Sequence, residues 1–177
     1  MSIIALVVGH TQKRQGAYNK KYDMSEFVFN KMIANWIQEY SGIDGIEIVY
    51  RDTYKELPFK INELNPDIIF SLHCNADGTR TASGSETLYY YSSELGKEIA
   101  TITQKNVVDA LELPDRGIKA KTHKDRGGYL LRHTKAPCVI VEPFFLTTNR
   151  EYKYIRSRIG DLIEAYVISI RESLVIV

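Results

Sequence analysis

Three stretches of the chain are short, apolar and rich in β-branched residues. They are SIIALVVG at residues 2–9, DIIFSLH at 67–73 and CVIVE at 138–142. Continuous apolar runs of this length are typical of strands that are covered on both faces, as in a parallel sheet. The run GSETLYYY at 84–91 predicts a further strand.

Between these runs, apolar residues recur every three or four positions, which is the spacing of one face of a helix. Residues 29–40 and 95–111 both follow this pattern. Strands that alternate with helices predict an α/β fold, with a mostly parallel twisted sheet and helices on both faces. No repeat, low-complexity tract or linker divides the chain, so we expect a single domain over residues 1–177.

The pattern of a last helix is the clearest. One apolar stripe runs from Ile155 to Ile170. Thr148, with Glu151 three residues later, has the pattern of a capping box at the start of this helix.

The size and composition fit a globular domain with a buried core. The chain has 177 residues, of which 44% are hydrophobic, and a formal net charge of +1. No apolar run reaches the roughly 18 residues of a membrane span, and the start lacks the features of a secretory signal. We therefore expect synthesis in the cytoplasm, with no membrane or nucleic-acid partner. Cys74 and Cys138 lie in or beside apolar runs, which favours free buried thiols.

Ionisable residues follow several of the predicted strands. His10 comes directly after the first strand, His73 ends the second apolar run, and Glu142 ends CVIVE. Glu26 lies three residues before Phe29, so it faces the core in the first turn of the first helix. Ligands of open α/β sheets bind at the carboxyl ends of the strands, so we expect these four side chains to meet at one edge.

Two histidines and a glutamate at one edge match a zinc site of the His, Glu, His type with a fourth position for water. Each residue also has a simpler interpretation. His10 could be a polar loop residue, His73 a hydrogen-bonded histidine at a strand end, and Glu26 part of a capping box with Asp23. Glu142 is harder to explain structurally, because a carboxylate after Val139, Ile140 and Val141 is costly to desolvate without a partner.

A set of landmarks follows in order along the chain. The first are the strand ending in GH and the glutamate heading the first helix, followed by SLHCNAD, GSETLYYY, DRGIKAK, GYLLRHTKAPCVIVEPFF and TTNREY. These landmarks resemble those of the zinc-dependent N-acetylmuramoyl-L-alanine amidases, the type-3 amidase family of phage endolysins and bacterial wall hydrolases. The resemblance covers residues 3 to 170. One departure is Pro143 followed by Phe144, where the family often has a small or polar residue and then a glycine before the phenylalanine.

The resemblance implies a role for each of the four residues. His10, Glu26 and His73 would be the ligands of Zn²⁺, and Glu142 the catalytic glutamate. The bond cut would join the lactyl group of muramic acid to the L-alanine of the stem peptide. Peptidoglycan would be the partner, and the enzyme, a phage endolysin or an autolysin taken to be a monomer, would act on the cell wall after release or export. Wall targeting would come from this domain, a separate chain or a longer parent protein.

Two other functions stay open at this point. A zinc peptidase that cuts within the stem peptide could use the same residues, and a non-catalytic wall-binding module could keep the fold. The presence of all three ligands and Glu142 argues against the second. Residues 116–135 form a predicted basic loop that either contacts stem-peptide carboxylates or is simply solvated, and His123 and His133 are interpreted as loop residues within it.

Overall fold

The computed structural model describes residues 2–177. Within them, six strands form one sheet in the order β4, β1, β5, β8, β6, β7. These strands span, in that order, Ile46–Tyr50, Ile4–Val8, Ile68–Leu72, Cys138–Glu142, Ser85–Tyr90 and Asp115–Lys121. β4, β1, β5 and β8 are parallel, β6 is antiparallel to β8, and β7 is parallel to β6. The prediction of a mostly parallel sheet is confirmed.

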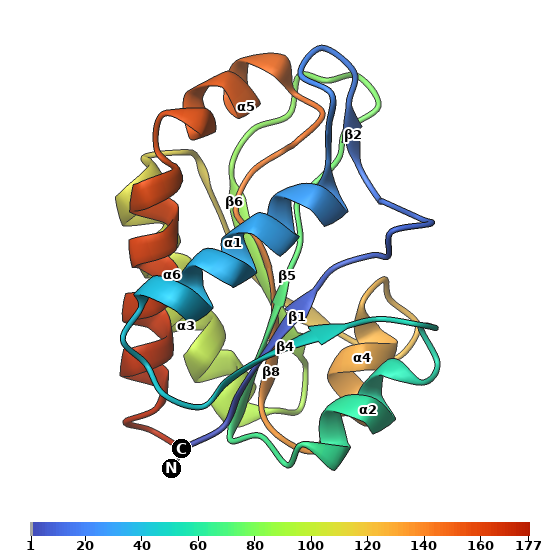
Figure 1. Cartoon of the computed structure of the whole chain (residues 1–177), viewed down its shortest axis with the longest axis vertical. Coiled ribbons are helices and arrows are strands. Elements are labelled where there is room, and N and C mark those ends of the chain that lie inside the picture. Colours follow the sequence, from blue (N-terminus) through green and yellow to red (C-terminus); the bar gives the residue numbers. More distant parts are fainter. Residues whose placement is uncertain (1) are drawn as a thin grey trace.

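Helices cover both faces of the sheet, as predicted (Figure 1). One face packs against α1 (Glu26–Tyr40), α3 (Glu94–Leu111) and α6 (Ile159–Ser173), and the other against α2 (Leu57–Glu63) and α4 (Gly128–His133). No helix within residues 2–177 is both long and apolar enough to cross a bilayer. A two-stranded hairpin of β2 (Tyr18–Asn19) and β3 (Met24–Ser25) lies between β1 and α1.

The alternation of side chains along β8 decides where its last residue points. Val139 and Val141 belong to the core beneath α1, α3 and α6, whereas Cys138 and Ile140 belong to the core beneath α2 and α4. Successive side chains of a strand face opposite sides of the sheet. Glu142 therefore falls on the α2 and α4 side, at the carboxyl end of the strand.

The prediction of one long last helix is wrong. The stripe is divided between α5 (Asn149–Arg156) and α6, and Arg158 between them has non-helical backbone angles. Tertiary contacts hold this break, because the guanidinium of Arg158 donates to the carbonyl of Ala110 at 3.2 Å and to Glu112 at 2.8 Å at the end of α3. Ile155 and Ile170 remain buried on the two separate helices.

The predicted capping box is also wrong. Thr148 does precede α5, but its hydroxyl donates to the carbonyl of Ala82 instead of capping the helix. The carboxylate of Glu151 is buried, and it accepts hydrogen bonds from the backbone N–H groups of Gly84 and Phe145, both at 2.8 Å. Glu151 thus joins the start of β6 to the segment that follows β8.

The basic segment at residues 116–135 is not one loop. Its first part is β7, its last part includes α4, and only the short connection between them is irregular. His133 lies at the end of α4, whereas His123 is in the connection. Cys74 and Cys138 are buried free thiols, as predicted.

Replacement of Glu151 by alanine is expected to destabilise the fold by about 2–6 kcal/mol, because two buried N–H groups would lose their acceptor at roughly 1–3 kcal/mol each. Denaturant unfolding measures the change. Glu164→Ala is the matched control, since Glu164 is an exposed helical glutamate on α6 and its loss should cost less than about 0.5 kcal/mol. Equal stabilities of the two variants would contradict the assignment.

Candidate active site

The parallel register places the ends of three strands at the same level. Val8 on β1 is paired with Leu72 on β5, which is paired with Val141 on β8. The next residues along each chain therefore emerge together at the carboxyl edge of the sheet. His73 and Glu142 are the residues directly after this level, and His10 follows one residue later on β1.

Glu26 reaches the same edge from α1. Ser25 caps this helix by accepting a hydrogen bond from the N–H of Val28, and Glu26 is the first helical residue, where the helix dipole favours an acid. Its carboxylate is almost fully buried and accepts hydrogen bonds from the N–H groups of Ala17 at 2.9 Å and Cys74 at 3.0 Å. Two backbone donors therefore fix the carboxylate at the edge.

The two histidines converge on this carboxylate. Nε2 of His10 lies 3.1 Å from one oxygen of Glu26, and Nδ1 of His73 lies 2.9 Å from the other. Burial alone would raise the pKa of Glu26, but its close polar contacts and charge interactions with the two histidines hold that pKa well below the usual range. The ionised form of Glu26 is thus favoured, and each of its two oxygens contacts one histidine.

These three residues fit a metal ion. One ligand atom from each lies within 4.8 Å of the others, and the set of two imidazoles and one carboxylate is the donor set of many catalytic metal centres. Nε2 of His10 is buried, and it lacks a well-aligned hydrogen bond even though Glu26 is near. A cation shared by the three side chains would satisfy this nitrogen and offset the buried charge of Glu26.

Two glycines leave room for the cluster. A Cβ on Gly16 would lie 2.4 Å from Oε2 of Glu26 and 2.5 Å from the ring of His10, and the φ angle of Gly16 is +76°. A Cβ on Gly9 would lie 2.7 Å from the ring of His73. His10 itself has a φ angle of +68°, a strained conformation for a residue with a side chain, which turns its ring toward Glu26.

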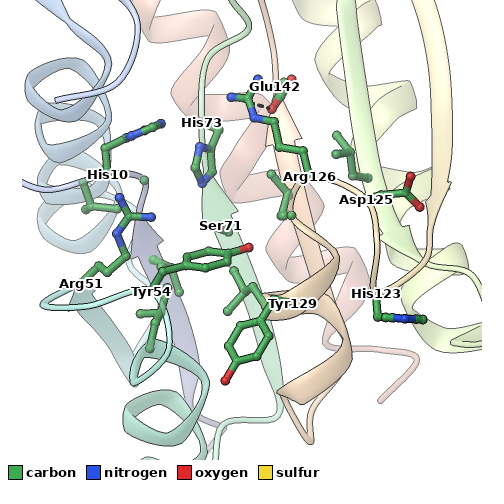
Figure 2. A pocket seen from close by; sticks show the side chains of 18 residues that line it. His10, Arg51, Tyr54, Ser71, His73, His123, Asp125, Arg126, Tyr129 and Glu142 are labelled. Carbon is green, nitrogen blue, oxygen red and sulfur yellow. Dashed lines mark ion pairs between the residues drawn. The ribbon is translucent and has the colours of Figure 1, made fainter. Parts of the chain in front are cut away.

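Glu142 lies beside the cluster on the strand next to that of His73. Its side chain is only 7% exposed, and the nearest cation is Arg126, whose Nη2 lies 4.0 Å from one carboxylate oxygen. Burial raises the pKa of Glu142, and the charges of Glu86 and Glu26 add to this, although His73 and Arg126 oppose it. Figure 2 shows Glu142 and His73 on neighbouring strands at the wall of one cavity.

A second carboxylate, Glu86 on β6, is the direct pairing partner of Glu142 on the neighbouring strand β8. Burial would raise its pKa, but hydrogen bonds from Asn75 at 2.8 Å and Arg116 at 3.0 Å lower it. The pKa values of these two neighbouring carboxylates are shifted in opposite directions. The group with the lowered pKa stays a fixed anion, and the group with the raised pKa can carry a proton. Glu142 is the one suited to exchange protons.

The cluster opens into a cavity of about 450 Å³ between the sheet and the ends of α2 and α4. Its floor is apolar apart from Ser71, and its rim carries Arg51, Tyr54, Arg126 and Tyr129 (Figure 2). The structure therefore brings together all four residues predicted from the sequence and adds an aromatic and cationic rim. His123 also lines the cavity, whereas His133 does not.

Sequence reasoning missed Arg51 and Ser71. Arg51 directly follows β4, a strand whose half-exposed sequence IEIVY was not recognised. Ser71 lies within the predicted strand, two residues before His73, on the same face of the sheet as His73. Both residues could have been found from the positions at which neighbouring strands end, but this comparison requires the order of the strands to be known.

The family model for N-acetylmuramoyl-L-alanine amidases matches residues 4–172. The chain belongs to this family. The amidase LytC of Bacillus subtilis (strain 168) is 27% identical to it over 113 residues, which are 61% of this chain and 22% of LytC. The chain spans less than half the length of the curated relatives that it matches.

Solved structures of amidases share the fold. An N-acetylmuramoyl-L-alanine amidase from Clostridium difficile 630 superposes with a TM-score of 0.83 at 27% identity, covering 98% of this chain and 96% of that one. The catalytic domain of the amidase CwlV from Bacillus (Paenibacillus) polymyxa var. colistinus gives a TM-score of 0.83 at 23% identity, covering 98% of each chain. The latter likeness concerns the fold alone.

Replacement of Gly16 by alanine is expected to weaken metal binding at least tenfold, because the new Cβ would push apart the side chains of Glu26 and His10. Chelator competition with a divalent metal measures the affinity. Gly78→Ala is the control, since a Cβ at Gly78 meets no atom within 4 Å. Metal affinity unchanged in the Gly16 variant would show that the cluster is not the metal site.

Proposed function

We propose that this domain, residues 1–177, hydrolyses the amide bond between N-acetylmuramic acid and L-alanine in peptidoglycan. The observation that carries the proposal is that a His, Glu, His cluster lies next to a buried glutamate, Glu142, at one cavity. The chain that has this site belongs to the amidase family. His10, Glu26 and His73 would hold Zn²⁺ as its three protein ligands.

The metal would polarise the scissile carbonyl as a Lewis acid and would lower the pKa of a bound water toward about 7, so that hydroxide is available at neutral pH. Glu142 would accept a proton from the attacking water and pass it to the nitrogen of L-alanine as the C–N bond breaks. The products are the lactyl carboxylate of muramic acid and a peptide with a free amino end, so atoms and charge balance.

The surroundings of Glu142 support its role. Burial raises its pKa toward the working range of a general base, and no group within residues 2–177 donates a hydrogen bond that would lock the carboxylate. Glu26, in contrast, has both oxygens engaged by backbone donors and histidines. One glutamate is thus suited to bind a cation and the other to carry a proton.

A zinc peptidase acting within the stem peptide is the rival, because the same residues would serve any amide. The family match favours the muramyl amide. We further propose that peptidoglycan is the partner, that the chain acts as a monomer, and that it reaches the wall after release or export, as an endolysin or an autolysin would.

The products of wall digestion separate the amidase from its rivals. Purified cell wall treated with the zinc-loaded chain should gain free amino ends on L-alanine without gaining reducing sugars, because the glycan strands stay intact. Amino-terminal labelling and a reducing-sugar assay measure both. New amino ends on other stem residues, with alanine still bound to muramic acid, would support the peptidase, and no new ends at all would support a binding module.

Two substitutions separate proton transfer from metal binding. Glu142→Gln keeps the shape of the side chain but removes the base, so turnover should fall by roughly 10²–10⁴ while zinc content stays near that of the unaltered chain. His73→Ala removes a ligand, so both zinc content and activity should be lost.

Zinc analysis by mass spectrometry and a wall-lysis assay on the same samples give both quantities. Thermal unfolding shows whether each variant is folded. The assignment of roles would fail if the Glu142 variant lysed walls normally, or if it lost zinc while the His73 variant retained it.

A further inference from the structure

Arg51 lies in the same row of residues as the reacting groups. Tyr50 at the end of β4 is paired with Val8, which is level with Leu72 and Val141. One residue further, Arg51, Gly9, His73 and Glu142 form a row across four parallel strands, and all four line the cavity on the α2 and α4 face. The row runs from a cation at one end to the candidate base at the other.

The guanidinium of Arg51 has no acidic partner. It is half-buried, and within residues 2–177 it makes no ion pair and donates no hydrogen bond. The acids next to it are already engaged, Asp52 with Lys60 at 3.1 Å and Glu56 with the hydroxyl of Thr53 at 2.6 Å. Burial lowers the pKa of Arg51, and the negative charge of Glu26 opposes this only in part, so the charge of the guanidinium is incompletely compensated.

The side chain is nevertheless held toward the cavity. Its guanidinium lies 5.5 Å from the ring centroid of Tyr54, which packs against Tyr129 at 5.6 Å between centroids. Figure 2 shows the guanidinium directed toward His10. Between Arg51 and His73 the row has only Gly9, which has no side chain to fill the space.

We propose that Arg51 binds the free α-carboxylate of the second residue of the stem peptide, and so makes the enzyme selective for substrates that carry this charge. That residue is a D-glutamate joined through its side-chain carboxyl, which leaves the α-carboxylate free. The proposal rests on the proposed function, since it takes the muramyl amide as the scissile bond. A planar guanidinium matches a carboxylate through two parallel hydrogen bonds.

Distance along the substrate favours this carboxylate. Neighbouring strands are about 4.8 Å apart, so the backbones of Arg51 and His73 are separated by about 10 Å. The α-carboxylate of the second residue is roughly 7 Å from the scissile nitrogen, two residues of extended chain. An arginine reaching over Gly9 covers the remaining gap, whereas carboxylates at the far end of the stem lie beyond it.

Arg126 is the other cation of the rim, and its position is less suitable for binding the substrate carboxylate. It lies 4.0 Å from Glu142 and is mostly exposed, so a carboxylate bound there would compete with the candidate base. Arg51 is separated from Glu142 by two strands.

The test compares two synthetic substrates of the zinc-loaded chain, both derivatives of N-acetylmuramoyl-L-alanyl-D-glutamate with the γ-carboxyl capped as a methylamide. One has a free α-carboxylate, and the other has an α-carboxamide. The unaltered chain should prefer the carboxylate substrate by roughly tenfold or more in kcat/KM, because a charge-assisted hydrogen bond typically changes binding by a factor of this size. Arg51→Met should bring the ratio close to one, mainly by raising KM for the carboxylate substrate, and Arg51→Lys should keep an intermediate ratio.

Arg132→Met is the matched control, because Arg132 is exposed on α4 outside the cavity and its loss should leave both substrates unaffected. Zinc content and thermal unfolding show that each variant is intact. The proposal is overturned if the unaltered chain treats both substrates alike, if Arg51→Met keeps the preference, or if Arg126→Met abolishes it instead. Cleavage of neither substrate by the unaltered chain would overturn the proposed function itself.

Discussion

The level of the parallel strand ends is the constraint on which the site depends. Because Val8, Leu72 and Val141 are paired across β1, β5 and β8, the next residues must emerge at one edge. A shift of one residue in any strand would turn its last side chain to the other face of the sheet. The buried apolar side chains of these strands prevent such a shift, so the core that stabilises the fold also aligns His73 with Glu142.

Glu26 connects this edge to the helical layer. Its carboxylate is buried at the start of α1, where two backbone N–H groups and two histidines surround it. An isolated buried carboxylate would be costly, and these partners make the ionised form the stable one. The same interactions lower its value as a proton carrier. A metal ligand and a general base therefore need different surroundings, which Glu26 and Glu142 have.

The sequence predicted those features that depend on local patterns. Apolar runs identified three central strands, and helical spacing placed Glu26 on the inner face of α1. Features set by distant contacts were missed or misread. Glu151 has the spacing of a capping box, yet its partners Gly84 and Phe145 come from other segments. The break before α6 follows from the hydrogen bonds of Arg158 to the end of α3. β4 was missed because its short, partly exposed sequence IEIVY is neither a continuous apolar run nor a regular alternation.

The polar groups of the chain differ in how completely they are satisfied. Glu151 and Gln104 are buried and fully engaged by other parts of the chain, which stabilises the fold. Ser71 and His10 have buried polar atoms without a hydrogen-bond partner, and so does Tyr166. Tyr166 lies within the core beneath α6, whereas Ser71 and His10 line the cavity, where a ligand can reach them. An unpaired group therefore indicates function only where it borders space that a substrate or ion can enter. By this criterion the unpaired atoms of Ser71 and His10 indicate function, because they border the cavity that Arg51, His73 and Glu142 also line, at a cost in stability that binding would offset.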